Sequence, residues 1–421
     1  MRWYQSRLTV SWLMRNLILF SAVAVYGQEP IPTDPALQVF FPYRQGVLHA
    51  TEVEVGMWVD QSTAQQVAAA LPTEIRALVE KGELTFSVQD TTDLPPSEEY
   101  VDATRQHYHK VEIEGGKLKN YVAGMPFPLI AAHDPQAGEK VMWNFRYRDR
   151  GDSEEFWGET RSLTATGALD RLVGLHGAFR YGMHRPAVAK NIPEWEQEGV
   201  YYKFVRELTA PPDVRGSITL TLRHDDDMKL DSEQFYDVQV RRVRPSPANH
   251  LASPFGFFTL QEDSWGFSGY LRPYRWRFIG EQSLLVPGLA KTDHVTLGGR
   301  GGWYPTGQPW ELRQVYVVEG IPVGSHPYAR RVLYVDKQTA NVLYILIFNS
   351  EGQHWRTIFR SYAHPDFTPW NKGQQIWVAL GHCWIDHVAE RATVYVAEKT
   401  VYNQPLSPQL FTRSRLLREE K

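Results

Sequence analysis

Few residue groupings in this chain could support catalysis. Glu262 and Asp263 form an adjacent carboxylate pair close to Trp265, and glycosidases use two carboxylates as acid and base. That chemistry needs the second carboxylate on the other side of the scissile bond, which neighbouring residues do not provide. The sequence holds no H-E-x-x-H, G-x-S-x-G or P-loop motif. We therefore predict no catalytic residue and a non-enzymatic protein; a hydrolase remains the open alternative if the fold assembles an acid–base or nucleophile set.

Metal and cofactor signals are equally sparse. Residues 224–227 (HDDD) are the densest run of carboxylates, but the run lacks the glycine and the terminal glutamate of a calcium-binding loop. His107 and His109 are two residues apart on an expected helix and face different directions, whereas a zinc pair needs convergent rings. Cys383 is the single cysteine, and the glycine-rich residues 298–302 lack the G-x-G-x-x-G spacing. We predict no metal and no cofactor.

Aromatic side chains are the more distinctive feature, since Phe, Trp and Tyr make up 13% of the chain. Segments 141–147 and 274–278 alternate apolar with polar residues, which is the pattern of a strand with one apolar and one wet face. The residues predicted to line a hydrophobic ligand cavity are Trp143, Phe145, Tyr147, Tyr274, Trp276 and Phe278. Ligand pockets and ordinary cores both use such rings, so the pattern leaves the two interpretations open.

Three arginines, Arg241, Arg242 and Arg244, lie together in the second half of the chain. A guanidinium group binds phosphate and carboxylate through two parallel hydrogen bonds. We therefore take this cluster as a candidate contact for an acidic headgroup or a partner protein. The alternative is a solvated end of a strand.

The overall charge narrows the class of partner. The 421 residues include 45 basic and 48 acidic side chains, a formal net charge of −3. Nucleic-acid-binding domains are usually strongly basic, so the near balance argues against a nucleic-acid partner. With 43% hydrophobic residues the composition is that of a globular chain, and its length allows a large core.

The first residues have the pattern of an export signal. Arg2, Arg7 and Arg15 precede an apolar run of nine residues, 17–25, and small residues follow. Nine residues are too few for a helix to cross a bilayer, which takes about 20. We predict that residues 1–27 are a cleaved signal peptide and that the mature chain is periplasmic. An uncleaved anchor is the alternative.

The rest of the chain divides by periodicity. Residues 28–139 are expected to be extended and helical, with helices over 62–70, 73–81 and 97–110. Residues 140–405 are expected to form an antiparallel sheet, and 406–421 a C-terminal tail. One expected strand covers 236–243. The strand over 342–348 is apolar at every position, which predicts cover on both of its faces. The predicted class is mainly β (α+β).

Several motifs carry a resemblance to a known family. They are residues 121–128 (YVAGMPFP), 134–138 (DPQAG), 143–144 (WN), 241–244 (RRVR), 266–269 (GFSG), 317–320 (VVEG) and 331–336 (RVLYVD). Their order is similar to that of an uncharacterised Gram-negative envelope family, domain of unknown function thirteen-twenty-nine, which is outer-membrane lipoprotein-sorting-like. The strand rhythm of 331–356 resembles the LolA/LolB-like carriers. The resemblance implies a large curved antiparallel sheet forming an unclosed barrel, with N-terminal helices at its mouth or concave face.

The resemblance also implies a function. We expect a periplasmic or outer-membrane-associated, non-enzymatic carrier that holds a lipid or other hydrophobic molecule in an aromatic-lined concavity. The alternative is a structural or accessory protein that docks an envelope transporter of the resistance-nodulation-division type. Peripheral contact with a membrane is compatible with both hypotheses.

Overall fold

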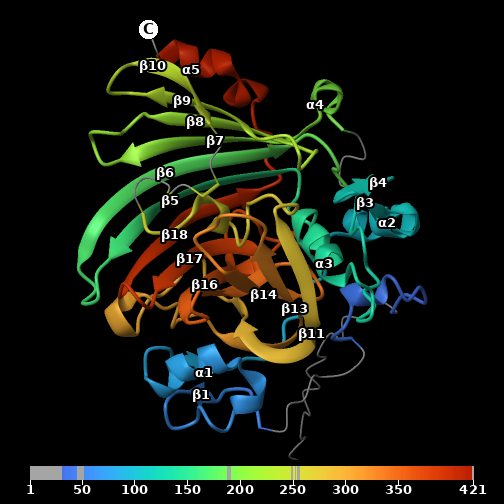
Figure 1. The fold of residues 1–421 in the computed structure, drawn as a ribbon, viewed down its shortest axis with the longest axis vertical. Coiled ribbons are helices and arrows are strands. Elements are labelled where there is room, and N and C mark those ends of the chain that lie inside the picture. Colours follow the sequence, from blue (N-terminus) through green and yellow to red (C-terminus); the bar gives the residue numbers. More distant parts are fainter. Residues whose placement is uncertain are drawn as a thin grey trace, which may run out of the picture. The chain divides into compact units, whose positions relative to one another are not determined.

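One curved antiparallel sheet dominates the part of the chain that the structure, a computed structural model, describes (Figure 1). The described residues are 31–44, 52–186, 191–247, 250, 251, 253 and 257–419. Residues 32–421 belong to one unit. The predicted signal peptide, residues 1–27, lies outside the described residues.

The sheet has 14 strands, in the spatial order β10-β9-β8-β7-β6-β5-β18-β17-β16-β15-β14-β13-β11, with β12 beside β16. Every pairing is antiparallel except the short β12–β16 pair. The strands are β5 (Ser153–Leu163), β6 (Leu169–Tyr181), β7 (Val200–Ala210), β8 (Ile218–His224), β9 (Ser232–Asp237), β10 (Arg242–Pro247), β11 (Tyr274–Pro287), β12 (Leu289–Ala290), β13 (Trp310–Pro322), β14 (Arg330–Asp336), β15 (Val342–Phe348), β16 (His354–Ala363), β17 (Val378–Asp386) and β18 (Arg391–Tyr402).

The sheet does not close on itself, because β10 and β11 are its two edges and pair with each other nowhere in the described residues. Two runs of neighbouring strands, β5 to β10 and β11 to β18, are joined where the last strand, β18, pairs with β5. The predicted class, mainly β with a large unclosed antiparallel sheet, is confirmed. The sheet runs from β5 to β18, so it begins at Ser153 rather than at residue 140.

The segment 141–147 is helical, and its prediction as a strand was wrong. Helix α3 (Ala137–Arg146) packs against β11, and Gly138 allows the approach, because a Cβ there would lie 2.6 Å from the carbonyl oxygen of Trp276. The burial follows helical spacing, since Gly138, Val141, Met142 and Phe145, at positions i, i+3, i+4 and i+7, are all buried. Over the short segment 141–147, positions 141 and 145 fit both the period of two and the i, i+4 spacing of a helix, so the alternation alone does not distinguish a strand from a helix.

The two faces of the sheet are covered by different segments. The inner face carries α3, helix α2 (Glu98–His107) and the loop 257–273. The outer face of β13 to β18 is covered by residues 57–94, including helix α1 (Thr73–Glu80) and the short strands β1 (Trp58–Val59) and β2 (Phe86–Ser87). The strand β15 is buried at all seven positions and contributes to both apolar clusters, which confirms its predicted cover on two faces.

The smaller elements complete the sequence comparison. The helices expected over 73–81 and 97–110 are present, the second continuing as a short 3-10 turn, whereas 62–70 forms turns ending in the 3-10 segment Ala68–Ala70. The expected strand 236–243 is wrong, because the chain turns between β9 and β10, with Arg241 at φ +50°. The expected tail contains helix α5 (Arg413–Glu419), whose Leu416 packs on the outer face of β6 to β9. The remaining elements are β3 (Glu112–Glu114), β4 (Lys117–Lys119) and α4 (Pro193–Glu198).

Candidate ligand cavity

A cavity lies between the inner face of the central strands and the loop 257–273, which we name the cover loop. The space between its walls is about 600 Å³, a volume that includes the part open to solvent. We name it the apolar cavity; its lining residues are Phe156, Thr160, Leu175, Phe204, Arg206, Phe257, Thr259, Ser264, Trp265, His382, Trp384, Thr393 and Tyr395. Five strands and the cover loop thus contribute to one enclosure.

The strand register brings these residues together. Thr160, Tyr395 and His382 are successive cross-strand partners on β5, β18 and β17, so their side chains share the inner face. Phe156 lies over Gly177 of β6, where a Cβ would come within 2.3 Å of the Phe156 ring. A glycine at this position therefore gives the ring its place on the inner face. The hydroxyls of Thr393 and Tyr395 are buried and have no hydrogen-bond partner among the described residues.

A second cavity, with a space of about 420 Å³ that includes the part open to solvent, is also lined by Trp265 and by other residues of the same loop. We name it the arginine cavity, because four guanidinium groups line it together with aromatic rings. Its lining residues are Phe145, Arg146, Arg148, Arg150, Phe179, Tyr181, Tyr201, Tyr202, Arg223, Trp265, Phe267 and Ser268. One cavity is thus mainly apolar and the adjoining one is strongly basic.

Trp265 is the residue that both cavities share. Its ring meets those of Phe179 and Phe204 edge-on, at centroid distances of 5.0 and 5.3 Å, and these two rings stack on each other at 4.2 Å. Trp265 has φ +53°, in the left-handed region that residues with a large side chain rarely adopt. Such a conformation costs about 1–3 kcal/mol and persists where its surroundings hold it. The surrounding rings therefore hold Trp265 at the place where the two cavities adjoin.

One end of the cover loop is tied to the sheet by a buried ionic network. Arg331 on β14 contacts the carboxylates of Glu262 and Asp263, the latter at 3.2 Å. Although burial alone would raise it, Arg331 and His326 hold the pKa of Glu262 below its ordinary value. Burial raises the pKa of Asp263, which accepts a hydrogen bond from the Tyr328 hydroxyl. The carboxylate pair considered above for catalysis is thus occupied by a structural arginine.

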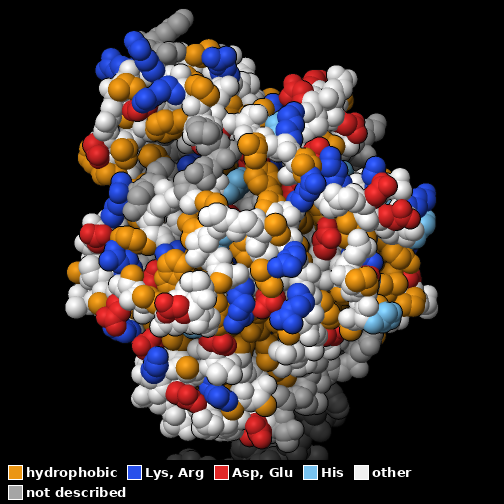
Figure 2. All heavy atoms as spheres, viewed as in Figure 1, with side chains coloured by type: hydrophobic (Ala, Val, Ile, Leu, Met, Phe, Trp, Pro, Cys, Tyr) orange, Lys and Arg blue, Asp and Glu red, His pale blue; other side chains and the backbone are white. Residues whose placement is uncertain are grey.

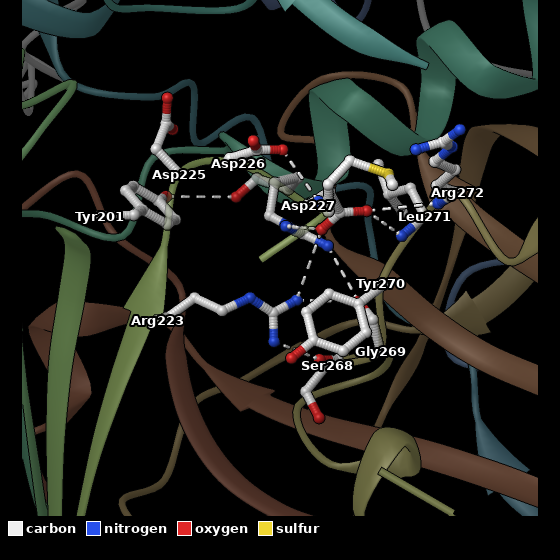
Figure 3. A network of polar contacts seen from close by, with 12 residues as sticks. Tyr201, Arg223, Asp225, Asp226, Asp227, Ser268, Gly269, Tyr270, Leu271 and Arg272 are labelled. Carbon is white, nitrogen blue, oxygen red and sulfur yellow. Dashed lines mark hydrogen bonds and ion pairs between the residues drawn. The ribbon is translucent and has the colours of Figure 1, made fainter. Parts of the chain in front are cut away.

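The other end of the cover loop is held by Asp227, as Figure 3 shows. This carboxylate accepts hydrogen bonds from the backbone N–H groups of Leu271 and Arg272 and pairs with Arg146 at 3.0 Å. Arg223 donates to the carbonyl oxygens of Ser268 and Gly269, at 3.0 and 3.1 Å. Asp227, the last residue of the run 224–227, therefore positions the loop.

The charges at the inner face are not all neutralised by carboxylates. Arg360 contacts His382 and the Tyr362 hydroxyl and forms no ion pair with a described carboxylate. Burial lowers the pKa of His382 well below its ordinary value, and Arg360 and Arg150 lower it further, so its imidazole is neutral at pH 7. Neutral His382 accepts the hydrogen bond from Arg360 at Nδ1.

A comparison with protein families decides the membership of the chain. The model of the family described as "Protein of unknown function (DUF1329)" matches residues 58–416. The chain belongs to this family. The membership expected from the sequence motifs is thereby confirmed.

Several proteins are similar to this DUF1329 chain. An uncharacterized protein of Pseudomonas aeruginosa is 26% identical over 259 residues, covering 58% of this chain and 54% of the relative, so the chain spans about half the length of that relative. A DUF1329 family protein from Desulfovibrio piger has 16% identity and a TM-score of 0.47, covering 67% of this chain and 99% of that one. A LolA superfamily protein from Nitrosomonas europaea has 12% identity and a TM-score of 0.40, covering 66% and 98%.

The aromatic residues singled out in the sequence lie mostly outside the two cavities. Trp143, Tyr274 and Trp276 are buried between α3 and β11, and Phe278 packs on Tyr316. None of these four candidates lines either cavity. Phe145 lines the arginine cavity, and Tyr147 lines a smaller one of about 320 Å³ beside it.

The basic cluster Arg241, Arg242 and Arg244 is exposed at the β10 edge. Arg244 pairs with Asp237 of the neighbouring strand at 2.7 Å. Figure 2 shows basic side chains gathered over β10 and α5. The cluster lines neither cavity and lies at an edge strand whose backbone is unpaired on one side within the described chain.

The sequence reasoning missed the residues that line the apolar cavity. Phe156, Phe204, Trp384 and Tyr395 stand on four separate strands, and Trp265 lies in a loop without periodicity. The motif at 266–269, directly after Trp265, was the one sequence feature that pointed to this loop.

Two further properties of the DUF1329 chain bear on its chemistry. In the described ranges, no group of three or more His, Cys, Asp or Glu side chains is placed to hold a metal ion. Among the same residues, no helix combines the length and the apolar character needed to cross a membrane.

Proposed function

We propose that this protein is a non-enzymatic carrier that holds a hydrophobic molecule in the apolar cavity under the cover loop. The single observation that carries the proposal is the cavity itself: side chains from five strands, four of which contribute aromatic rings, around a space of about 600 Å³ that is partly open to solvent. Transferring apolar surface from water into such an enclosure is worth about 25 cal/mol per Å². Between α3 and β11, Trp143, Tyr274 and Trp276 are buried and line neither cavity.

The arrangement of charges supports binding rather than catalysis. The carboxylates at the cover loop, Glu262, Asp263 and Asp227, are each engaged by arginines or by backbone N–H groups. His382 is neutral and accepts from Arg360, and no carboxylate of the described residues contacts it. We therefore propose that the site retains and releases its ligand without chemical change.

The proposed location is the periplasm, with the outer membrane as a possible destination of the cargo. It rests on the predicted signal peptide at residues 1–27. Export would also account for a single, buried cysteine, Cys383, in an oxidising compartment.

A dye titration tests the carrier function. Thr160 lies inside the apolar cavity, and Thr160→Phe should fill part of it; Thr219 is also buried on the inner face, opposite Arg206, but lines neither cavity. We expect the neutral dye N-phenyl-1-naphthylamine to bind the wild type, and Thr160→Phe to weaken its binding at least tenfold. The matched Thr219→Phe variant should stay within twofold of the wild type. Equal binding by both variants would contradict the proposed cavity.

The exposed β10 edge favours the second candidate, an accessory protein that docks an envelope transporter. Arg241, Arg242 and Arg244 present positive charge beside unpaired backbone groups, and edge strands of this kind accept a further strand. Protein that binds no dye but binds an envelope membrane fraction, with loss on Arg242→Glu, would favour docking over carriage.

A further inference from the structure

We propose that the cargo is an anionic amphiphile, whose acidic group binds Arg148 in the arginine cavity while its apolar chain occupies the apolar cavity. This inference rests on the proposed carrier function and specifies its ligand class. It depends on three observations: an uncompensated buried guanidinium, an unpartnered donor beside it, and the adjacency of the two cavities.

The first observation concerns Arg148. Its side chain is buried, and its hydrogen bonds run from Nε to Asn341 Oδ1 at 3.0 Å and from Nη1 to the carbonyl oxygen of Phe145 at 2.6 Å. Neither acceptor is charged, and no carboxylate of the described residues forms an ion pair with it. A buried charge without a counter-charge is unfavourable, so its retention points to a partner outside the chain.

The other arginines of this cavity differ from Arg148. Arg146 pairs with Asp227 at 3.0 Å, Arg223 pairs with Asp231 at 3.2 Å, and Arg150 pairs with Glu154. These pairs neutralise three of the four guanidinium groups and leave the charge of Arg148 in excess. Burial lowers the pKa of Arg148 to about 10, and the nearby Arg150 lowers it too, although the group stays protonated at pH 7.

The second observation is a free donor at the same cavity. Tyr181 lines the arginine cavity and is 5% exposed, yet its hydroxyl has no hydrogen-bond partner among the described residues. The Nε of Arg223, which also lines this cavity, is buried without a partner as well. Buried donors are nearly always paired, so both are suited to an acceptor that a ligand supplies. Phosphate and carboxylate oxygens accept from guanidinium and hydroxyl donors together.

The third observation is that the two cavities adjoin at one residue. Trp265 lines both, so a chain in the apolar cavity and an acidic group at Arg148 would both lie close to its side chain. The strained backbone at φ +53° places the ring there. A molecule with one apolar and one acidic end matches the pair of cavities better than a wholly apolar molecule does.

A displacement experiment on the full chain tests this ligand class. The bound neutral dye is displaced by decanoate, decyl phosphate, decanol or inorganic phosphate. For the wild type we expect decanoate and decyl phosphate to bind at least tenfold tighter than decanol, and inorganic phosphate to leave the dye in place. Displacement by inorganic phosphate as effective as that by decyl phosphate would mean a free-anion site and would overturn the amphiphile.

Variants then locate the selectivity. Arg148→Met should reduce the preference for the acidic compounds over decanol to below threefold, and Arg148→Lys should keep part of it. Tyr181→Phe removes only the unpartnered hydroxyl and should weaken acidic ligands twofold to fivefold without affecting decanol. Arg277→Met, which removes an exposed arginine on β11, should change nothing.

The outcomes separate the two proposals. If decanol binds as tightly as decanoate, or if the preference for acidic compounds survives in both Arg148→Met and Tyr181→Phe, the proposed anionic ligand class is wrong. The proposed carrier function is not affected by that result. If no compound displaces the dye, or if Thr160→Phe binds the dye as tightly as the wild type does, the proposed carrier function is wrong. If Arg148→Met does not fold, Arg148→Lys and Tyr181→Phe still decide the question.

Discussion

Two pairs of arginines are buried in this sheet in opposite ways. Arg313 and Arg331 are 0% exposed and each lies between two carboxylates: Arg313 pairs with Glu311 at 2.8 Å and Asp336 at 2.7 Å, and Arg331 contacts the pair in the cover loop. Arg148 and Arg360 are 7% and 2% exposed and pair with no carboxylate of the described chain. The first pair connects segments of the fold, whereas Arg148 lines the arginine cavity and Arg360 contacts His382, which lines the apolar cavity.

The difference distinguishes a structural charge from a binding charge. Nearby carboxylates raise the pKa of Arg313 and Arg331 despite their burial, so the folded chain itself stabilises the charged form. Burial lowers the pKa of Arg148, so the folded chain does not compensate its charge. The following predictions test this contrast, beginning with the largest expected effect.

Arg313→Met should cost about 3–5 kcal/mol of unfolding free energy, because it leaves two buried carboxylates without their counter-charge. Urea denaturation at pH 7 measures this, with Arg277→Met as the exposed control. A loss below about 1 kcal/mol would remove the distinction between the two pairs, since the paired arginine would then not be structural.

Acidification should destabilise the protein through His382. Its folded pKa lies below its unfolded pKa, so its contribution is present above about pH 6.5 and is lost as the pH falls below that value. The expected loss is at most about 1.4 kcal/mol for each pH unit below about 6.5.

Urea denaturation at pH 7.5 and pH 5 measures this loss. Other buried histidines shift in the same direction, and burial lowers the pKa of His387 to about 3, so the difference between the wild type and His382→Gln isolates the effect. An unchanged difference at the two pH values would show that His382 is not held neutral beside Arg360.

Arg148→Met should change the unfolding free energy by only about 1 kcal/mol, since the loss of two hydrogen bonds is offset by removal of an uncompensated charge. Urea denaturation of Arg148→Met and Arg313→Met, both without ligand, measures the two changes in unfolding free energy side by side. A loss of 3 kcal/mol or more would assign Arg148 to the structural pair and leave its part in binding without support.

Arg244→Ala should have the smallest effect, below about 0.5 kcal/mol, because its ion pair with Asp237 is at the solvent-exposed edge. The same denaturation series measures it. A loss above 1 kcal/mol would mean that the β10 edge is needed for folding rather than available for docking.

The sequence predicted some parts of this molecule and not others, for physical reasons. The strands of the last third were predictable because short turns separate runs with clear period-two or fully apolar patterns, as in β14 and β15. Helix α3 was mistaken for a strand because positions 141 and 145 fit both the period of two and the i, i+4 spacing of a helix. Because α3 is buried against β11, Trp143 lines neither of the two cavities.

The apolar cavity could not be predicted from the sequence because it depends on the register of the strands and on where the cover loop lies. Phe156 and Tyr395 are 239 positions apart and meet only because β18 pairs with β5. Their centroids are 6.2 Å apart in the folded chain. The importance of Arg148 depends on the absence of a nearby carboxylate, which a single sequence does not show.

Native mass spectrometry of the full chain, purified without detergent, tests the central claim most directly. The account predicts a wild-type species carrying one hydrophobic molecule that ionises as an acid, strongly reduced in Thr160→Phe and retained in Thr219→Phe. Wild-type protein that is reproducibly free of any such molecule, and takes up none when mixed with decanoate, would contradict it.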